Sequence, residues 1–99
     1  MKAVGLGVAG IALLASPAYA SLASVTGAQA WDDSGHTTFS VKDTACDSNS
    51  VYGYWNNTSN RLNNSSGCGT TVKKTTSGIT SVRACVNKPL ASDPCSDWN

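Results

Sequence analysis

The side chains of this chain that are able to do acid, base or nucleophilic chemistry are few: one histidine, six aspartates, four cysteines and no glutamate. Nucleophilic catalysis needs a nucleophile, a base and an orienting group held together. Hydroxyl groups are abundant, but His36 is the one imidazole and follows a glycine in a polar turn, where a surface role is expected. The aspartates also cluster in turns, where they are expected to cap backbone amides rather than to form a glycosidase-type pair. The sequence therefore predicts that the protein is not an enzyme and has no cofactor.

Metal binding is not expected from the remaining polar groups. The cysteines stand too far apart in the chain for a zinc knuckle, which needs closely spaced pairs. Asp43, Asp47 and Asn49 form a loose oxygen-rich group, but their spacing is not that of a calcium loop and Cys46 interrupts it. We expect this segment to form Asx turns and no metal site.

The four cysteines are expected to form two disulfides, because small exported domains bury too little apolar surface to be stable without cross-links. Cys85 lies in the best predicted strand, and Cys95 follows a proline-containing tail long enough to fold back against it. We therefore favour Cys85 with Cys95, which leaves Cys46 with Cys68. Four cysteines allow three pairings, and the sequence alone excludes none of them.

Tyr52, Tyr54 and Trp55 are the candidate binding residues. They lie close together in a predicted strand, and aromatic rings on a neutral, asparagine-rich surface bind sugar rings by stacking. The competing interpretation is that tryptophan simply fills the core of so small a domain. Alternation places Trp55 on the same face as Val51, pointing inward, so a ligand surface would form mainly through the two tyrosines.

Residues 1–20 are predicted to be a cleaved secretory signal peptide. A lysine at the start is followed by an apolar run over 3–15, and Ala18 and Ala20 are the small residues that a signal peptidase accepts. The apolar run is too short to span a bilayer. A second possible cut lies after Ala30, but we favour the cut after Ala20 because it lies closer to the apolar run. A secreted, extracellular protein without membrane attachment is expected.

Charge excludes further classes of partner. After removal of the signal peptide, six basic residues balance six aspartates. A nucleic-acid-binding protein needs a strong basic patch, and so does a protein held on an anionic membrane surface. Neither kind of partner is expected, and we expect a monomer.

Alternation of β-branched and polar residues predicts an all-β fold without helices. Residues 21–36 are expected to form a flexible N-terminal arm, and residues 37–99 a disulfide-stapled β domain. Within that domain we expect strands at 37–43, 51–55, 69–74 and 78–88, the last two as a hairpin. A loop is expected at 56–67, interrupted by a possible short strand at Arg61-Leu62, and an irregular tail at 88–99. A small antiparallel β-sandwich or barrel of about four to six strands follows.

Several turn and cysteine motifs lie between residues 41 and 98. They are Asp43 with Val51-Tyr52-Gly53, the segment 64–72 around Cys68, Val82-Arg83-Ala84-Cys85, and Asp93-Pro94-Cys95-Ser96 followed by Trp98. With these motifs the chain resembles a recurring type of small secreted, disulfide-containing protein of actinobacteria. That group has no established activity, so the resemblance implies a bacterial origin and a fold but transfers no functional residue.

The sequence favours a secreted, non-catalytic extracellular binding domain, whose ligand would be a cell-surface polysaccharide or another protein. The alternative is a small enzyme inhibitor or antagonist protein, in which the disulfide-framed loop 86–94 would enter an enzyme cleft. A sugar-binding protein would need a flat aromatic face and an inhibitor one exposed, rigid loop. The exposure of Tyr52 and Tyr54 therefore discriminates between the two.

Overall fold

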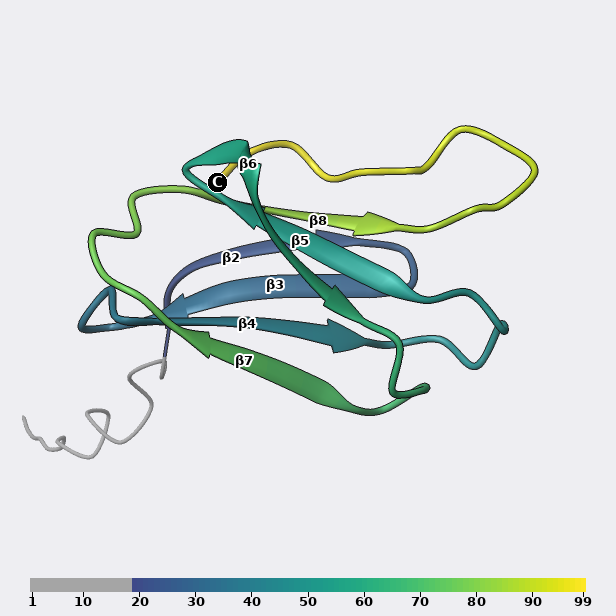
Figure 1. Cartoon of the computed structure of the whole chain (residues 1–99), viewed down its shortest axis with the longest axis horizontal. Coiled ribbons are helices and arrows are strands. Elements are labelled where there is room, and N and C mark those ends of the chain that lie inside the picture. The colour runs from purple at the N-terminus through teal and green to yellow at the C-terminus, as the bar shows by residue number, and fades with distance from the viewer. Residues whose placement is uncertain (1–18) are drawn as a thin grey trace, which may run out of the picture.

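The computed structural model describes residues 19–99, and most of the predicted signal peptide lies outside them. Seven strands form two antiparallel sheets packed face to face (Figure 1). One sheet has the order β2-β3-β4-β7 and the other β6-β5-β8. The strands are β2 (Tyr19–Val25), β3 (Ala28–Asp33), β4 (Thr38–Asp43), β5 (Val51–Trp55), β6 (Asn57–Asn64), β7 (Thr71–Thr75) and β8 (Val82–Val86). The predicted all-β sandwich is confirmed, with more strands than expected and no helix among the described residues.

The core lies between the sheets and follows the predicted alternation. Phe39 and Val41 of β4 are fully buried, and Phe39 packs against Trp55 of β5 with ring centroids 5.1 Å apart. Gly53 of β5 lies opposite Phe39 and Val41 across the core. A Cβ atom there would lie 2.8 Å from Phe39 Cζ and 2.9 Å from Val41 Cγ2, so the two sheets meet at this point only because the residue has no side chain.

The prediction that residues 21–36 form a flexible arm was wrong, because most of these residues lie in strands. β2 pairs with β3, and β3 pairs with β4, so residues 21–33 belong to the larger sheet. Their inward positions, Ala23, Ala28 and Ala30, are at most 1% exposed where β2 and β3 pack against β8. Because the fully buried apolar residues of these two strands are all alanines, the segment lacks the large apolar alternation that marks a strand in sequence.

Residues 56–67 were predicted as a loop with a possible short strand at Arg61-Leu62, and most of this segment forms the longer strand β6. This strand is the edge of the smaller sheet, and most of its side chains are exposed and polar. Its last residue, Asn64, is fully buried, and the amide donates to the carbonyl oxygens of Val41 at 3.0 Å and Thr70 at 2.9 Å. The composition of β6 resembles that of a loop because most of its side chains are exposed to water and therefore polar.

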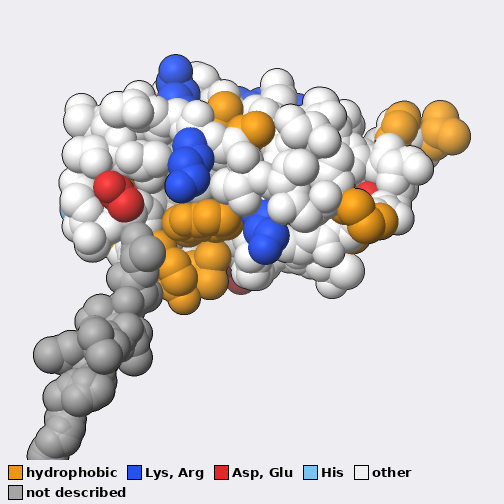
Figure 2. All heavy atoms as spheres, turned by 90° about the horizontal axis from the view of Figure 1, so that it is seen from below, with side chains coloured by type: hydrophobic (Ala, Val, Ile, Leu, Met, Phe, Trp, Pro, Cys, Tyr) orange, Lys and Arg blue, Asp and Glu red, His pale blue; other side chains and the backbone are white. Residues whose placement is uncertain are grey.

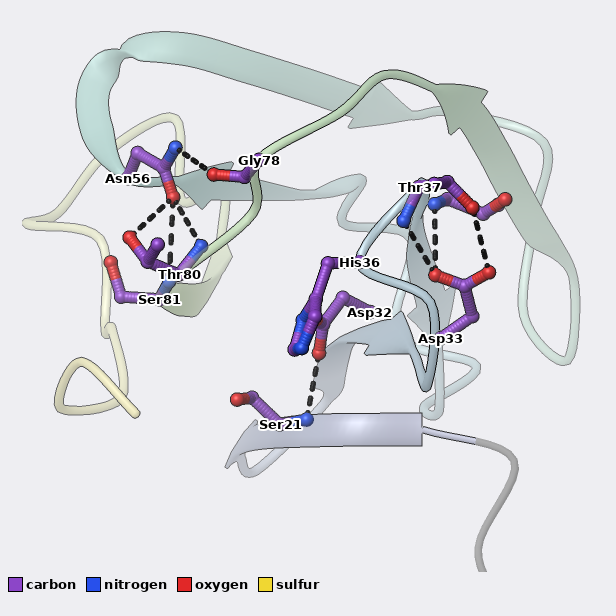
Figure 3. A network of polar contacts seen from close by, with 10 residues as sticks. Ser21, Asp32, Asp33, His36, Thr37, Asn56, Gly78, Thr80 and Ser81 are labelled. Atoms are coloured by element: carbon purple, nitrogen blue, oxygen red, sulfur yellow. Dashed lines mark hydrogen bonds and ion pairs between the residues drawn. The ribbon is translucent and has the colours of Figure 1, made fainter.

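The predicted hairpin over residues 69–88 was also wrong. β7 pairs with β4 in one sheet and β8 pairs with β5 in the other, so the chain crosses between sheets after β7. Asn56 holds the crossing segment (Figure 3). Its Oδ1 accepts from the amides of Thr80 at 2.7 Å and Ser81 at 3.3 Å, and its Nδ2 donates to the carbonyl oxygen of Gly78 at 2.9 Å.

Both favoured disulfides are confirmed. Cys46–Cys68 ties the loop between β4 and β5 to the loop between β6 and β7. Because each of these loops leads from one sheet to the other, this bridge links two crossings at the same end of the sandwich. Cys85–Cys95 ties β8 to the C-terminal segment.

The C-terminal segment runs antiparallel beside β8 and covers its edge. Val82 and Asn99 exchange backbone hydrogen bonds of 3.0 and 2.9 Å, and Ser96 donates to the carbonyl oxygen of Ala84 at 2.8 Å. The Asn99 side chain donates to the carbonyl oxygen of Leu22 in β2 at 2.6 Å. An open strand edge invites pairing with other chains, and this segment removes that edge. Among residues 19–99 there is no helix long and apolar enough to cross a membrane.

Candidate functional site

The predicted aromatic surface does not form as expected. Tyr52 is only 4% exposed: its hydroxyl donates to Asp93 Oδ2 at 2.6 Å, and the Arg61 guanidinium lies 3.5 Å above its ring. Trp55 faces the core, as the alternation indicated, and is 8% exposed. Two of the three candidate binding residues are therefore covered by the protein itself.

Tyr54 is the remaining candidate, and it is half-buried beneath the C-terminal segment. Trp98 stacks on it with ring centroids 6.3 Å apart and an angle of 27° between the planes. The rings of Tyr52 and Tyr54 meet edge to face at 77°. Rings in these orientations do not form the flat, open platform that sugar stacking needs. The tyrosines fasten the C-terminal segment to the sheet.

Tyr52 and Asp93 are 41 positions apart in the sequence and form a hydrogen bond, and this contact shifts the pKa of both side chains. Burial, then the hydrogen bond to Asp93, raises the pKa of the Tyr52 hydroxyl well above its usual range. The hydrogen bond from Tyr52, assisted by the backbone amide of Lys88, lowers the pKa of Asp93. A neutral phenol and a charged carboxylate therefore fasten one side of the loop that follows β8.

That loop, residues 87–94, projects from one end of the sandwich (Figure 1). At its base Asn87 donates its backbone amide to the carbonyl oxygen of Ser50 at 2.9 Å, and Val86 donates to Pro94 at 3.0 Å. Inside the loop, the Lys88 amide donates to Asp93 Oδ1 at 2.8 Å. Together with the neighbouring Cys85–Cys95 bridge, these bonds brace both arms of the loop.

Leu90 stands at the tip of the braced loop and is 99% exposed, the highest value among the exposed large apolar side chains. Figure 2 shows apolar side chains standing clear of the body at the same end. A turn closed by the Ala91 amide and the Lys88 carbonyl oxygen, 3.4 Å apart, carries it outward. Sequence reasoning chose this loop for the inhibitor alternative but did not single out Leu90. The signal was present as a leucine beside a proline in an otherwise polar tail.

A recess of about 620 Å³ opens beside the base of this loop. The disulfide Cys46–Cys68, Asn87 and Pro89 line it, and the rest of the lining comes from residues 43, 45, 47–50, 65 and 67. Apolar tip and polar recess thus share one end of the sandwich, which we call the loop end: residues 44–50, 65–70 and 87–94.

The oxygen-rich segment next to the recess forms Asx turns, as expected. Asp43 Oδ1 accepts from the amide of Ala45 at 3.1 Å, and Asp47 Oδ1 accepts from the amide of Asn49 at 3.0 Å. Each carboxylate therefore serves its own turn. In the described part of the chain no group of three or more histidine, cysteine or acidic side chains is arranged to hold a metal ion.

A second polar cluster lies at the opposite end, around Asp32 (Figure 3). His36 Nδ1 lies 2.8 Å from Asp32 Oδ2, and the backbone amide of Ser21 donates to Asp32 Oδ1 at 2.7 Å. Asp32 is fully buried, whereas the His36 side chain is 52% exposed. An imidazole oriented by a carboxylate is part of a hydrolase triad, but within residues 19–99 no hydroxyl group hydrogen-bonds the ring of His36.

On the outer face of the larger sheet, Tyr19, Leu22 and Trp31 line a shallow recess of about 390 Å³ with Gln29 and Lys42. Figure 2 shows apolar side chains between basic ones close to where the described chain begins.

A comparison of the chain with protein-family models, with curated proteins and with solved structures found no match. Any function must therefore be argued from these sites.

Proposed function

We propose that the protein is a secreted, non-catalytic binding protein that engages a partner protein through its loop end, with Leu90 as the anchor. The observation that carries the proposal is an almost fully exposed leucine at the tip of a loop braced on both arms. The two disulfides of the chain agree with an oxidising, extracellular destination.

The energetics favour a loop of this kind as a binding element. Full burial of a leucine side chain contributes about 1.5 to 3 kcal/mol. Binding usually costs free energy because loops and side chains become ordered, and a loop that is already braced avoids much of that cost. The side chains that dominate binding energy are those that become fully buried near the centre of an interface, inside a ring of contacts that excludes water, and the residues that line the recess beside the loop are placed to supply part of such a ring.

A protein partner suits this site better than a polysaccharide. Sugar rings stack on flat aromatic faces, and Tyr52, the first aromatic proposed for that role, is covered by Arg61 and Asp93. A leucine at a loop tip instead matches an apolar pocket on a protein surface. The resemblance to small secreted proteins of actinobacteria remains part of the proposal and adds no ligand to it.

The alternative function, inhibition of an enzyme, rests on the same loop. The Cys85–Cys95 bridge frames it in the manner expected of an inhibitor loop. The turn from Lys88 to Ala91, however, projects the Leu90 side chain outward from a bend in the chain and does not present an extended segment. Clefts that bind peptides by strand addition accept extended segments, so the turn favours an antagonist that fills a pocket over a substrate-like inhibitor.

The experiment compares the mature protein with its Leu90→Ser variant, using Ala91→Ser as the matched control on the same exposed turn. Both are tested against immobilised extracellular proteins of the source organism and its neighbours, a panel of secreted proteases and a glycan array. We expect saturable binding to one protein that Leu90→Ser weakens at least about tenfold and Ala91→Ser leaves nearly unchanged. Binding that survives Leu90→Ser, or binding to glycans alone, contradicts the proposal.

A further inference from the structure

Asp32 is a buried carboxylate whose negative charge is only partly compensated by its neighbours in the folded chain. Its carboxylate is fully buried on β3, and burying a charge is costly unless a partner of opposite charge compensates for it. Its two partners are the His36 ring, which is charged only when protonated, and the backbone amide of Ser21, which carries no formal charge. No lysine or arginine forms an ion pair with Asp32 in the described residues.

The backbone of β2 is shaped to bring the Ser21 nitrogen to this carboxylate. The register of β2 against β3 is regular from Leu22 onward, but it shifts between Tyr19 and Leu22. Within this irregular stretch the Ser21 nitrogen points to Asp32 Oδ1 at 2.7 Å (Figure 3). This is the distance of a strong, charge-assisted hydrogen bond.

Ser21 is also the residue that follows the predicted signal-peptide cut. Cutting the bond between Ala20 and Ser21 adds water across the peptide bond, so that Ala20 ends in a carboxylate and Ser21 begins with an α-amino group. That group is protonated at neutral pH or below. The cut therefore converts the neutral donor on Asp32 into a cation at the same atom.

We propose that the mature protein begins at Ser21 and that its α-ammonium group forms an ion pair with the buried carboxylate of Asp32. The proposal rests on the prediction that the chain is exported, and it is independent of what the loop end binds.

The alternative cut, after Ala30, is incompatible with the fold. It would remove all of β2 and half of β3, including the fully buried Ala28 and Ala30. β4 would lose most of its partner on one side. Asp32 would then be the second residue of the chain and would lose the Ser21 donor.

The proposed ion pair also makes the mature chain different from its precursor. Before the cut Ser21 carries an amide, and within residues 19–99 His36 is the one ionisable side chain of basic type that pairs with Asp32. After the cut the new charge stabilises the folded state at the junction of β2, β3 and the turn that follows β3. Stability is thereby added only to the processed form.

The first test is the intact mass of the exported protein in a secreting bacterial host. A chain that begins at Ser21 is expected. A product that begins at Trp31, or one that keeps residues before Ser21, overturns the proposal.

The second test isolates the charge. The chain 21–99 is prepared by chemical synthesis and oxidative folding with a free Ser21 amine or with an acetylated one, which keeps the N–H donor and removes the charge. We expect acetylation to lower the melting temperature by about 5 °C or more. In Asp32→Asn chains the two forms should melt together, whereas Asp97→Asn, an aspartate of the C-terminal segment, should preserve the difference. Equal melting temperatures in the unaltered chain refute the ion pair.

The third test needs no variant and covers the case in which Asp32→Asn does not fold. The rate at which a small amine-directed reagent labels the Ser21 amine is measured in the folded protein and in the reduced, denatured chain. An α-ammonium held by Asp32 reacts only through local opening, so labelling should be at least about tenfold slower in the folded protein. Equal rates show a free terminus and overturn the proposal.

Discussion

The contact between the two sheets at Gly53 predicts a large effect from the smallest possible substitution. Gly53→Ala adds one methyl group to β5, and its Cβ would lie 2.8 Å from Phe39 Cζ, 2.9 Å from Val41 Cγ2 and 3.1 Å from the carbonyl oxygen of Arg83. Ordinary van der Waals separations between carbon atoms are about 3.5 to 4.0 Å. The methyl group must therefore displace its neighbours by most of an ångström.

None of these neighbours yields easily. Phe39 and Val41 are fully buried, and the Arg83 carbonyl belongs to the adjacent strand β8. Forcing an extra methyl group into a packed core costs about 1 to 3 kcal/mol. Against this, alanine loses less backbone entropy than glycine on folding, which returns about 0.5 to 1 kcal/mol. We therefore expect Gly53→Ala to lower the free energy of unfolding by roughly 1 to 2 kcal/mol.

The assay is equilibrium unfolding in guanidinium chloride with the disulfides intact, followed by tryptophan fluorescence. Gly35→Ala is the matched control, because a Cβ there would meet nothing closer than 3.7 Å, and it should leave the midpoint unchanged or raise it slightly. Adding Phe39→Leu to Gly53→Ala should recover part of the loss, since the shorter side chain makes room. If Gly53→Ala is as stable as Gly35→Ala, or if Phe39→Leu adds its full cost on top, the inferred steric contact is refuted.

Three further predictions follow from the bridges and polar contacts. Replacing Cys46 by alanine should lower the free energy of global unfolding by about 3.4 kcal/mol, because its bridge spans a sequence separation of 22 and links two sheet crossings. Replacing Cys95 should lower that free energy by about 2.7 kcal/mol and increase amide exchange mainly in the C-terminal segment. Equal exchange patterns in the two variants would contradict this. Because the pKa of Asp93 is lowered in the folded protein, its carboxylate stabilises the fold fully above the unfolded pKa of about 3.9, and this stabilisation is lost as pH falls through the folded pKa. The Lys88 amide, which donates to Asp93, should therefore lose its protection from hydrogen exchange in acid, and Asp93→Asn should abolish that pH dependence. His36→Ala should leave a folded protein that still binds its partner, with a stability loss of about 1 kcal/mol for one hydrogen bond from a half-exposed ring; a loss of activity without loss of stability would instead support an enzyme.

Features that depend on short-range pattern were predictable from the chain. Phe39 and Val41 stand two positions apart in β4, as residues on one face of a strand do, and both are buried; Val82 and Val86 in β8 follow the same period. The disulfide pairing also followed from local considerations, since a short tail brings Cys95 back to the strand it has just left. Asx turns at Asp43 and Asp47 need partners only two residues away.

Strand pairing was not predictable in the same way. The short connection between the two β-branched runs suggested a hairpin. β7 and β8 nevertheless lie in different sheets, because Ile79 is buried in the core and Asn56 holds the crossing segment. The small residues of β2 and β3 carried no strand signal, because their burial depends on how closely β8 approaches.

The same division applies to function. Residue alternation and the cysteines by themselves determined the class of molecule, a small all-β chain with two disulfides and nearly balanced charges. The tertiary structure alone decided which side chains are available. Tyr52 is covered by Asp93 from 41 positions away, Leu90 is left exposed, and the Ser21 nitrogen lies against Asp32. Exposure and electrostatic environment depend on contacts between distant segments, and only folding brings those segments together.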